Sequence, residues 1–230
     1  MGDEIDEEAL LAEQLRYYRA RAPEYEDWWY RLGRYRMLPQ DWDRWAADVA
    51  AAEELVDRFA PRGKVLELAC GTGLWTRRLR RWADHLTAVD AAPEVLDLNR
   101  SRLEPDAGPV SFVEADVFAW NAPERYDVVF FSFWLSHVPP SRFDEFWQVV
   151  DRALAPDGRF LFLDSAGEET LHEATQGVVC RRTLADGRDF RIVKQFFEPE
   201  PLARRLRDLG WEADVTQVGT SFVAGWGRRR

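Results

Sequence analysis

The feature that most constrains this chain is a loop with two glycines that directly follows a short apolar run. Residues 65–73 read Val-Leu-Glu-Leu-Ala-Cys-Gly-Thr-Gly, so a segment of strand character ends in a turn. Glycine lets the backbone turn sharply and lets a ligand come within contact distance. A helix expected from Leu74 onward would direct its N-terminus at that ligand. The loop predicts a nucleotide-like ligand, and alone it does not distinguish one cofactor class from another.

The segments after the loop alternate in a way that indicates an α/β fold. Short apolar runs, expected as strands, lie at 64–69, 86–89, 110–113, 126–131 and 159–163. Stretches with helical periodicity lie between them, near 74–83, 93–103 and 141–154. Such alternation is typical of a parallel sheet covered by helices on both faces. Then follow an expected β-ribbon over 178–196, a helix over 202–209 and two last strands at 211–218 and 221–227.

Composition excludes several classes of protein. The net charge of −10 does not suit general binding to a nucleic-acid backbone. There is no run of about 18 apolar residues to span a membrane, and the acidic start argues against a targeting peptide. The two cysteines, Cys70 and Cys180, are too few for a disulfide framework or a zinc site. We therefore expect a cytoplasmic protein with no metal, no nucleic-acid partner and no membrane association.

Two positions near the loop argue against a dinucleotide. The dinucleotide fingerprint places a third small residue three positions after the second glycine, where this chain has Thr76. Glu67 lies in the run before the loop, and a carboxylate there would repel a pyrophosphate. The same carboxylate would suit a cofactor that carries an amino group and a sulfonium.

Two carboxylates follow the next expected strands. Asp90 ends the second strand, at the edge where open α/β sheets bind ligands, and it can accept hydrogen bonds from both ribose hydroxyls. Asp116 follows the third strand in the same way. The alternatives are that Asp90 caps the next helix and that Asp116 is a turn residue.

Together these segments resemble the class I S-adenosylmethionine-dependent methyltransferases. The resemblance covers roughly residues 64–164 and rests on the segments 67–73, 86–90, 113–117, 126–131 and 155–159. It implies a Rossmann-like, doubly wound, seven-stranded sheet that is mostly parallel with an antiparallel last strand, plus an N-terminal helical cap. It also implies methyl transfer from S-adenosylmethionine to an O, N or S atom of a small-molecule acceptor, which leaves S-adenosylhomocysteine.

The resemblance assigns residues to the cofactor. It implies that Asp116 binds the adenine amino group, that the Val117 amide serves a ring nitrogen, and that a cap tyrosine reaches the methionine carboxylate. The expected cofactor-binding residues are Tyr17, Tyr25, Glu67, Ala69, Gly71, Thr72, Gly73, Thr76, Asp90, Ala91, Asp116, Val117 and Ser132.

The segment after the fourth strand runs beside the transferred methyl group in this family. His137 in that segment is the candidate catalytic base, which is needed only if the acceptor must lose a proton. The alternative is that His137 packs or caps the loop. The candidate acceptor residues are Tyr18, Arg21, Trp29, Phe133 and Trp134.

Aromatic and basic residues elsewhere leave alternatives open. The cap is rich in aromatic residues, which either line an acceptor pocket or attach the cap to the sheet: Trp28, Trp29, Tyr30, Trp42 and Trp45. The expected ribbon carries Arg181, Arg182, Arg188 and Arg191. These cations could bind an acidic acceptor, although such sets are more often solvated surface.

We expect one domain over residues 1–230. Its parts are a cap at 1–60 and a cofactor-binding core at 61–230, within which 165–197 forms an insertion or β-ribbon on the acceptor side. A monomer or homodimer is expected. The alternative functions are a nucleotide-dependent oxidoreductase, a non-catalytic S-adenosylmethionine-binding protein and a subunit of a larger complex.

Overall fold

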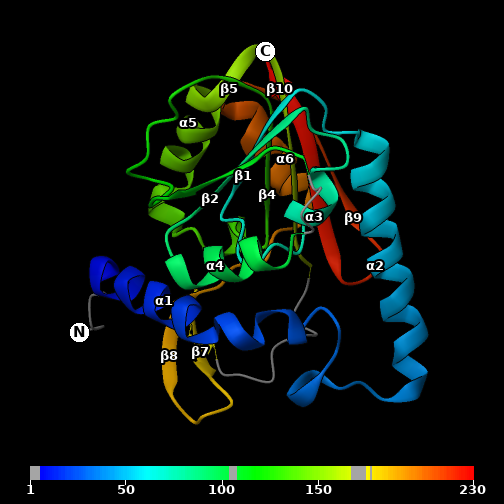
Figure 1. The fold of residues 1–230 in the computed structure, drawn as a ribbon, viewed down its shortest axis with the longest axis vertical. Coiled ribbons are helices and arrows are strands. Elements are labelled where there is room, and N and C mark those ends of the chain that lie inside the picture. Colours follow the sequence, from blue (N-terminus) through cyan, green and yellow to red (C-terminus); the bar gives the residue numbers. More distant parts are fainter. Residues whose placement is uncertain (1–5, 104–107, 167–174, 177) are drawn as a thin grey trace.

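A seven-stranded sheet forms the centre of the computed structural model, which describes residues 6–103, 108–166, 175–176 and 178–230 (Figure 1). The strand order is β3-β2-β1-β4-β5-β10-β9. The strands are β1 (Lys64–Leu68), β2 (His85–Asp90), β3 (Val110–Glu114), β4 (Tyr126–Ser132), β5 (Leu154–Ser165), β9 (Trp211–Val218) and β10 (Phe222–Arg229). Strands β1 to β5 pair in parallel, whereas β10 is antiparallel to both of its neighbours. The predicted mostly parallel sheet with an antiparallel last strand is confirmed.

Helices cover both faces of this sheet. One face carries α2 (Pro39–Phe59), α3 (Thr76–Leu79) and α4 (Pro93–Ser101), and the other carries α5 (Phe143–Ala153) and α6 (Pro199–Asp208). Figure 1 shows α2 and α5 on opposite sides of the molecule. Successive residues of β4 divide between the faces, since Phe130 packs with Val56 of α2 and Phe131 packs with Phe146 of α5. Burial on both faces explains the unbroken apolar run at 128–131 within β4.

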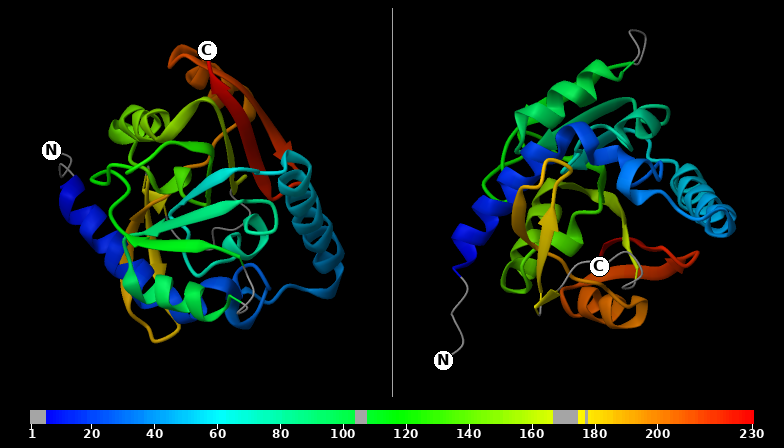
Figure 2. Two further views of the ribbon diagram at one scale, coloured as in Figure 1. Left: turned by 45° about the horizontal axis from the view of Figure 1, so that its top comes forward. Right: turned by 90° about the horizontal axis from the view of Figure 1, so that it is seen from below.

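The N-terminal segment lies against a separate ribbon. It consists of α1 (Glu7–Arg21) and the 3₁₀ turns η1 (Ala22–Asp27) and η2 (Gly33–Tyr35). The ribbon contains β6 (Thr175–Gln176), β7 (Val179–Thr183) and β8 (Asp189–Val193), and Figures 1 and 2 show β7 and β8 beside α1. Residues 167–174 and 177 of the predicted insertion lie outside the described residues. Within the predicted cap, residues 6–35 lie over the strand ends, whereas α2 packs along the sheet.

Local chemistry explains where α1 begins and what holds it. Asp6 caps the helix, because its carboxylate accepts a hydrogen bond from Ala9 N at 3.1 Å. Gln14 then joins α1 to two other elements. Its Nε2 donates to His137 O at 3.1 Å, and its Oε1 accepts from Val193 N at 2.9 Å. Among the described residues, no helix combines the length and the apolar character needed to cross a membrane.

Asp48 fastens α2 to the turn between β9 and β10. Its Oδ2 accepts hydrogen bonds from the amide and hydroxyl of Ser221 at 3.0 and 2.7 Å, and from those of Thr220 at 3.0 and 2.9 Å. Burial would raise the pKa of this carboxyl, but the four hydrogen bonds hold the pKa below its ordinary value.

Replacing Asp48 by asparagine is expected to lower the free energy of unfolding by about 2 kcal/mol at pH 7, because an amide oxygen accepts more weakly than a carboxylate. Since the folded-state pKa is lowered, the stabilisation is present above the ordinary pKa near ~4 and is lost as the pH falls through the folded-state value. Urea unfolding between pH 7 and pH 3 measures the free energies of unfolding of wild type and Asp48→Asn. The difference between the two values should become smaller in acid. Asp43→Asn, exposed on the same helix, is the control. An equal decrease in the free energy of unfolding in both variants would contradict the prediction.

Candidate functional site

A cavity, called the main cavity below, lies where β1, β2 and β4 end. Its lining combines residues that follow these strands with residues of α1 above them. The lining residues are Leu11, Ala12, Gln14, Leu15, Tyr18, Tyr25, Ala69, Gly71, Asp90, Ala91, Val95, Asp116, Val117, Phe118, Ser132, Phe133, Trp134 and Arg142. The carboxyl edge of an open parallel sheet is the usual ligand site of such folds.

The glycine loop forms the floor of the main cavity by adopting left-handed backbone angles. Ala69 has φ +51°, Gly71 +53° and Gly73 +91°. A side chain at Gly73 would overlap the buried carboxamide of Asn99, so glycine is required there on steric grounds as well. A Cβ on Gly71 would lie 3.7 Å from the ring of Tyr25, which shows how closely the cap covers the loop. The left-handed conformation is unfavourable for a residue with a Cβ, so the backbone is strained at Ala69. Such strain often marks a ligand site.

Asp90 ties the loop to the end of β2. Its Oδ2 accepts a hydrogen bond from Gly71 N at 2.9 Å, and its Oδ1 accepts one from Ala92 N at 3.0 Å. Burial raises the pKa of Asp90 to about 6, although backbone hydrogen bonds act in the opposite direction. Each carboxylate oxygen keeps a further lone pair, so the same side chain can accept from a ligand diol.

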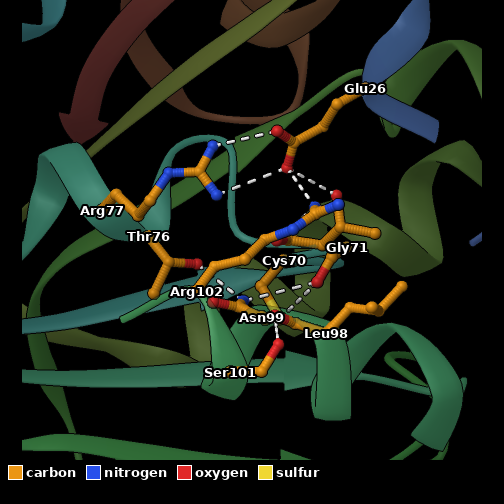
Figure 3. A network of polar contacts seen from close by, with 10 residues as sticks. Glu26, Cys70, Gly71, Thr76, Arg77, Leu98, Asn99, Ser101 and Arg102 are labelled. Carbon is orange, nitrogen blue, oxygen red and sulfur yellow. Dashed lines mark hydrogen bonds and ion pairs between the residues drawn. The ribbon is translucent and has the colours of Figure 1, made fainter. Parts of the chain in front are cut away.

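A second polar chain supports the loop from behind, and Figure 3 shows its members Thr76, Asn99 and Gly71. Thr76 Oγ1 donates to Glu67 Oε2 at 2.6 Å, and Asn99 Nδ2 donates to Thr76 Oγ1 at 2.8 Å and to Gly71 O at 3.3 Å. Burial raises the pKa of Glu67 to about 8; the Thr76 hydrogen bond lowers it and the charge of Asp90 raises it further. Near neutral pH this carboxyl is therefore mainly protonated. Glu67 and Thr76 support the loop and lie outside the lining of the main cavity.

Glu26 of the cap reaches the same loop from the other side. Figure 3 shows its carboxylate between Arg77 and Arg102. Arg77 Nη2 donates to Oε2 at 3.0 Å, and Arg102 Nη1 donates to Oε1 at 2.5 Å. Thr72 Oγ1, within the glycine loop, donates to Oε1 at 2.8 Å. The Glu26 side chain is only 11% exposed. These contacts therefore hold the cap against the loop, and the Glu26 carboxylate is largely shielded from water.

A second cavity, called the side cavity below, adjoins the main cavity at Tyr18, Tyr25 and Phe133, which line both. Its other lining residues are Arg21, Trp28, Tyr35, His137, Ser165, Arg182, Ile192 and Lys194. Phe133 follows β4 with φ +49°, so left-handed backbone geometry again marks the place where the cavities meet. The side cavity thus combines aromatic rings with three basic side chains.

His137 has protein partners at both ring nitrogens. Nδ1 lies 2.6 Å from Val193 O, which can only accept, so this nitrogen carries the proton. Nε2 lies 2.8 Å from Tyr18 Oη and accepts its hydrogen bond in the neutral ring. Burial and the nearby charge of Lys194 hold the pKa of His137 well below its ordinary value. The imidazole is therefore neutral and positions Tyr18 between the two cavities.

Comparison with known proteins identifies the family. A family model described as a methyltransferase domain matches residues 65–158. DhpI, solved with SAH, is 39% identical over 96% of this chain and 97% of its own, with a TM-score of 0.79. DhpI was also solved as a SAM-HEP complex. The chain belongs to the class I S-adenosylmethionine-dependent methyltransferases.

Curated relatives of this methyltransferase match over shorter segments. Trans-aconitate 2-methyltransferase of Streptomyces avermitilis is 29% identical over 164 residues, which is 67% of this chain and 60% of the relative. Demethylmenaquinone methyltransferase of Leptospira interrogans is 32% identical over 117 residues, which is 48% of this chain and 46% of the relative. The methyltransferase therefore spans about half the length of these curated relatives.

Most predicted cofactor residues of the methyltransferase line the main cavity. These are Tyr25, Ala69, Gly71, Asp90, Ala91, Asp116, Val117 and Ser132. Thr72 and Gly73 belong to the loop but not to the lining, since Thr72 turns toward Glu26. Among the predicted acceptor residues, Trp134 lines the main cavity and Arg21 lines the side cavity.

Two other predicted ligand residues pack in the protein interior. Tyr17 is fully buried against the ribbon, with its ring 5.7 Å from that of Phe190, on a different side of α1 from Tyr18. Trp29 is 4% exposed and stacks on Phe222 at 5.6 Å, which attaches the cap to the end of the sheet. The position of Trp29 therefore agrees with the alternative in which the cap aromatics attach the cap to the sheet.

Sequence reasoning missed several lining residues of the methyltransferase. They are Leu11, Ala12, Gln14, Leu15, Tyr35, Val95, Phe118, Arg142, Ile192 and Lys194. One signal was available, because lysine occurs only at positions 64 and 194 in a chain whose other cations are arginines. Lys194 is one of these two lysines, and it directly follows β8.

Proposed function

We propose that this methyltransferase binds S-adenosylmethionine in the main cavity and transfers its methyl group to a small molecule in the side cavity. The observation that carries the proposal is the junction of the two cavities at Tyr18, Tyr25 and Phe133. A methyl group directed through this junction would meet an acceptor held on the other side.

The main cavity has the donors and acceptors that this cofactor needs. Asp90 would accept from the ribose hydroxyls, and Asp116 with the Val117 amide would hold adenine between apolar walls. The left-handed loop at Ala69 and Gly71 would present backbone groups to the amino acid end, and Tyr25 would cover it. When bound, the cofactor supplies an electrophilic methyl group on a sulfonium.

The residues of the chain contribute mainly by positioning. Methyl transfer is an in-line displacement, so holding acceptor and methyl carbon at contact distance supplies a large part of the rate. Aromatic faces of Tyr18, Tyr25 and Phe133 would accommodate the positive sulfonium while excluding water. The names of the relatives point to varied small molecules, which supports a small acceptor without selecting one.

The remaining features of the proposal concern the whole chain. Residues 1–230 would act as one domain, as a monomer or homodimer. The net charge of −10 supports an acceptor other than nucleic acid. The two cysteines are free and buried, which supports a reducing, cytoplasmic setting.

Calorimetric titration tests the proposal. We expect S-adenosylmethionine and S-adenosylhomocysteine to bind with a dissociation constant of about 10 μM or tighter, because binding buries the apolar lining and satisfies Asp90. NADH and NADPH should show no binding. Tight binding of a nicotinamide cofactor without binding of S-adenosylmethionine would support the oxidoreductase alternative. Binding without formation of S-adenosylhomocysteine across acceptors of every class would support the non-catalytic one.

A further inference from the structure

One end of the main cavity contains an arginine that the proposed function does not use. Arg142 lines this cavity together with residues that follow β3 and β4, namely Asp116, Val117, Phe118 and Trp134. Asp116 and Val117 are the residues proposed above to hold adenine. Arg142 therefore belongs to the end of the main cavity that would take the base of the cofactor.

Two contacts fix the guanidinium of Arg142 in this place. Its Nε and Nη2 donate to the two carboxylate oxygens of Glu145, at 2.8 and 2.9 Å. Its Cζ lies 3.7 Å from the centroid of the Phe118 ring, which is a favourable cation–π distance. The Arg142 side chain is only 26% exposed. A guanidinium held in this way is oriented before a ligand arrives, so a contact with it costs little side-chain entropy.

The third nitrogen of Arg142 remains available to a ligand. Nη1 has no hydrogen-bond partner within the part of the chain that the structure describes, because Glu145 engages only Nε and Nη2. The hydrogen bond to Glu145 raises the pKa of the guanidinium, burial lowers it, and the negative charges of Glu145, Asp116 and Glu7 add to the rise. Since this cation is already surrounded by carboxylates, its free donors suit a neutral acceptor and not an anion.

Asp116 supplies the opposite hydrogen-bonding character at the same end of the cavity. Its Oδ1 accepts a hydrogen bond from Phe118 N at 2.9 Å, whereas no described residue donates to its Oδ2. Phe118 links the two groups, because its amide binds Asp116 and its ring lies against Arg142. This end of the cavity therefore offers a ligand one acceptor, at Asp116, and one donor, at Arg142.

An acceptor combined with a donor complements one edge of adenine. That edge carries the N6 amino group, which donates, and N7, which accepts, whereas guanine presents two acceptors there, O6 and N7. In the proposed binding mode Asp116 accepts from N6, and the Val117 amide donates to the neighbouring ring nitrogen N1. N1 and N7 lie on either side of N6 in a purine. N7 is therefore the acceptor beside N6 that this mode leaves for Arg142.

We propose that Arg142 is a specificity-determining residue, which donates from Nη1 to N7 of the adenine of the cofactor while Asp116 accepts from N6. This inference rests on the proposed function, because it requires the cofactor to occupy the main cavity. Glu145 engages the other side-chain nitrogens of Arg142, which leaves the donors of one nitrogen for the base. They fit N7 of adenine, and the carboxylate of Asp116 repels the O6 of a guanine.

Analogues of S-adenosylhomocysteine with one atom of the base replaced test this contact. A C–H group replaces N7 in the 7-deaza analogue and N1 in the 1-deaza analogue. In calorimetric titrations we expect wild type to bind the 7-deaza analogue about tenfold more weakly than S-adenosylhomocysteine, because a C–H group cannot accept from Arg142. Arg142→Met keeps an unbranched side chain over Phe118 but has no donors, so it should bind the two ligands within about twofold of each other. Discrimination against the 1-deaza analogue should be the same in both proteins, since the Val117 amide is unchanged.

Arg205→Met provides the matched control. Arg205 also lies over a phenylalanine ring, 3.5 Å from the centroid of Phe143, and its Nη2 lies 3.1 Å from Asp144 Oδ1. It does not belong to the described lining of either cavity, so this variant should discriminate against the 7-deaza analogue as wild type does.

The outcomes separate this inference from the proposed function. Equal binding of S-adenosylhomocysteine and its 7-deaza analogue by wild type would overturn the role of Arg142 and leave the cofactor site intact, and this measurement requires no variant to fold. Undiminished discrimination in Arg142→Met would overturn it as well. If wild type does not bind S-adenosylhomocysteine, the proposed function itself fails, and the inference fails with it.

Discussion

Asp90→Ala is expected to weaken the binding of S-adenosylmethionine and S-adenosylhomocysteine about 100-fold. The substitution removes the proposed acceptor of the ribose hydroxyls. It also removes the hydrogen bonds from Gly71 N at 2.9 Å and Ala92 N at 3.0 Å that shape the loop. Hydrogen bonds to a charged group contribute about 1.5–3 kcal/mol each, and the loss of about 3 kcal/mol corresponds to about 100-fold in affinity.

Replacing Asp90 by asparagine instead should not destabilise the free protein strongly. Because burial raises the pKa of Asp90 to about 6, the folded protein binds this proton more tightly than the unfolded chain does. Ionisation of Asp90 therefore opposes folding at pH values above its ordinary pKa near ~4, and the full cost is present above pH 6. We expect Asp90→Asn at pH 7.5 to unfold at a temperature close to that of wild type while its cofactor affinity falls.

Calorimetric titrations between pH 5 and pH 8 measure both effects. In wild type the affinity for S-adenosylhomocysteine should fall as the pH drops through about 6, because protonation removes the charge that accepts from the ribose. In Asp90→Asn this part of the pH dependence should disappear. Asp84→Ala, exposed just before β2, is the control and should bind as wild type does. Unchanged affinity in Asp90→Ala would remove this residue from the cofactor site.

The parts of the site that the sequence could predict are those fixed by local geometry. Asp90 and the loop at Gly71 meet because β1 and β2 are adjacent parallel strands, and parallel strands end at the same edge. The alternation of apolar runs was enough to predict the sheet, and the antiparallel β10 followed from the family resemblance. Residues immediately after a strand are thus predictable without knowledge of distant contacts.

The residues that sequence reasoning missed or misplaced depend on long-range packing. Tyr17 and Tyr18 are neighbours on α1, and which of them faces the cavity depends on where the ribbon packs. Glu67 lies next to the loop in sequence, but its side chain turns toward Thr76 behind the loop. Lys194 reaches the site because β8 packs against the segment at Ser136, a contact between residues 58 positions apart. No local pattern carries this information.

The contact of Glu26 with the glycine loop predicts a large kinetic effect. Tyr18 and Tyr25 of the cap line the main cavity, so we expect a cofactor that occupies it to leave when the cap moves away. The ion pairs of Glu26 with Arg77 and Arg102 must break in that movement, since both arginines belong to the core. Glu26→Gln keeps the shape of the side chain but removes its charge, and it leaves two half-buried guanidinium groups without their carboxylate.

We expect Glu26→Gln to raise the dissociation rate of S-adenosylhomocysteine about 30-fold. Removing one partner from a fully buried charge pair costs about 3–5 kcal/mol, and the exposure of Arg77 and Arg102, 26% and 31%, reduces this to about 2 kcal/mol. That loss corresponds to about 30-fold in the population of the open cap. Stopped-flow displacement, followed by tryptophan fluorescence, measures the rate.

A second ion pair between cap and core provides the matched control. Arg19 of α1 donates to both oxygens of Glu94 of α4, as close as 2.7 Å, but both side chains are 46% exposed. Exposed pairs contribute about 0.5 kcal/mol, so Glu94→Gln should change the dissociation rate about twofold. Equal rates in the two variants would mean that the ligand leaves without breaking the Glu26 contact. A rate that rises only in Glu26→Gln, with an equal rise in the dissociation constant, would show that the partly buried contacts of Glu26 keep the cap closed and that the exposed Arg19–Glu94 pair does not.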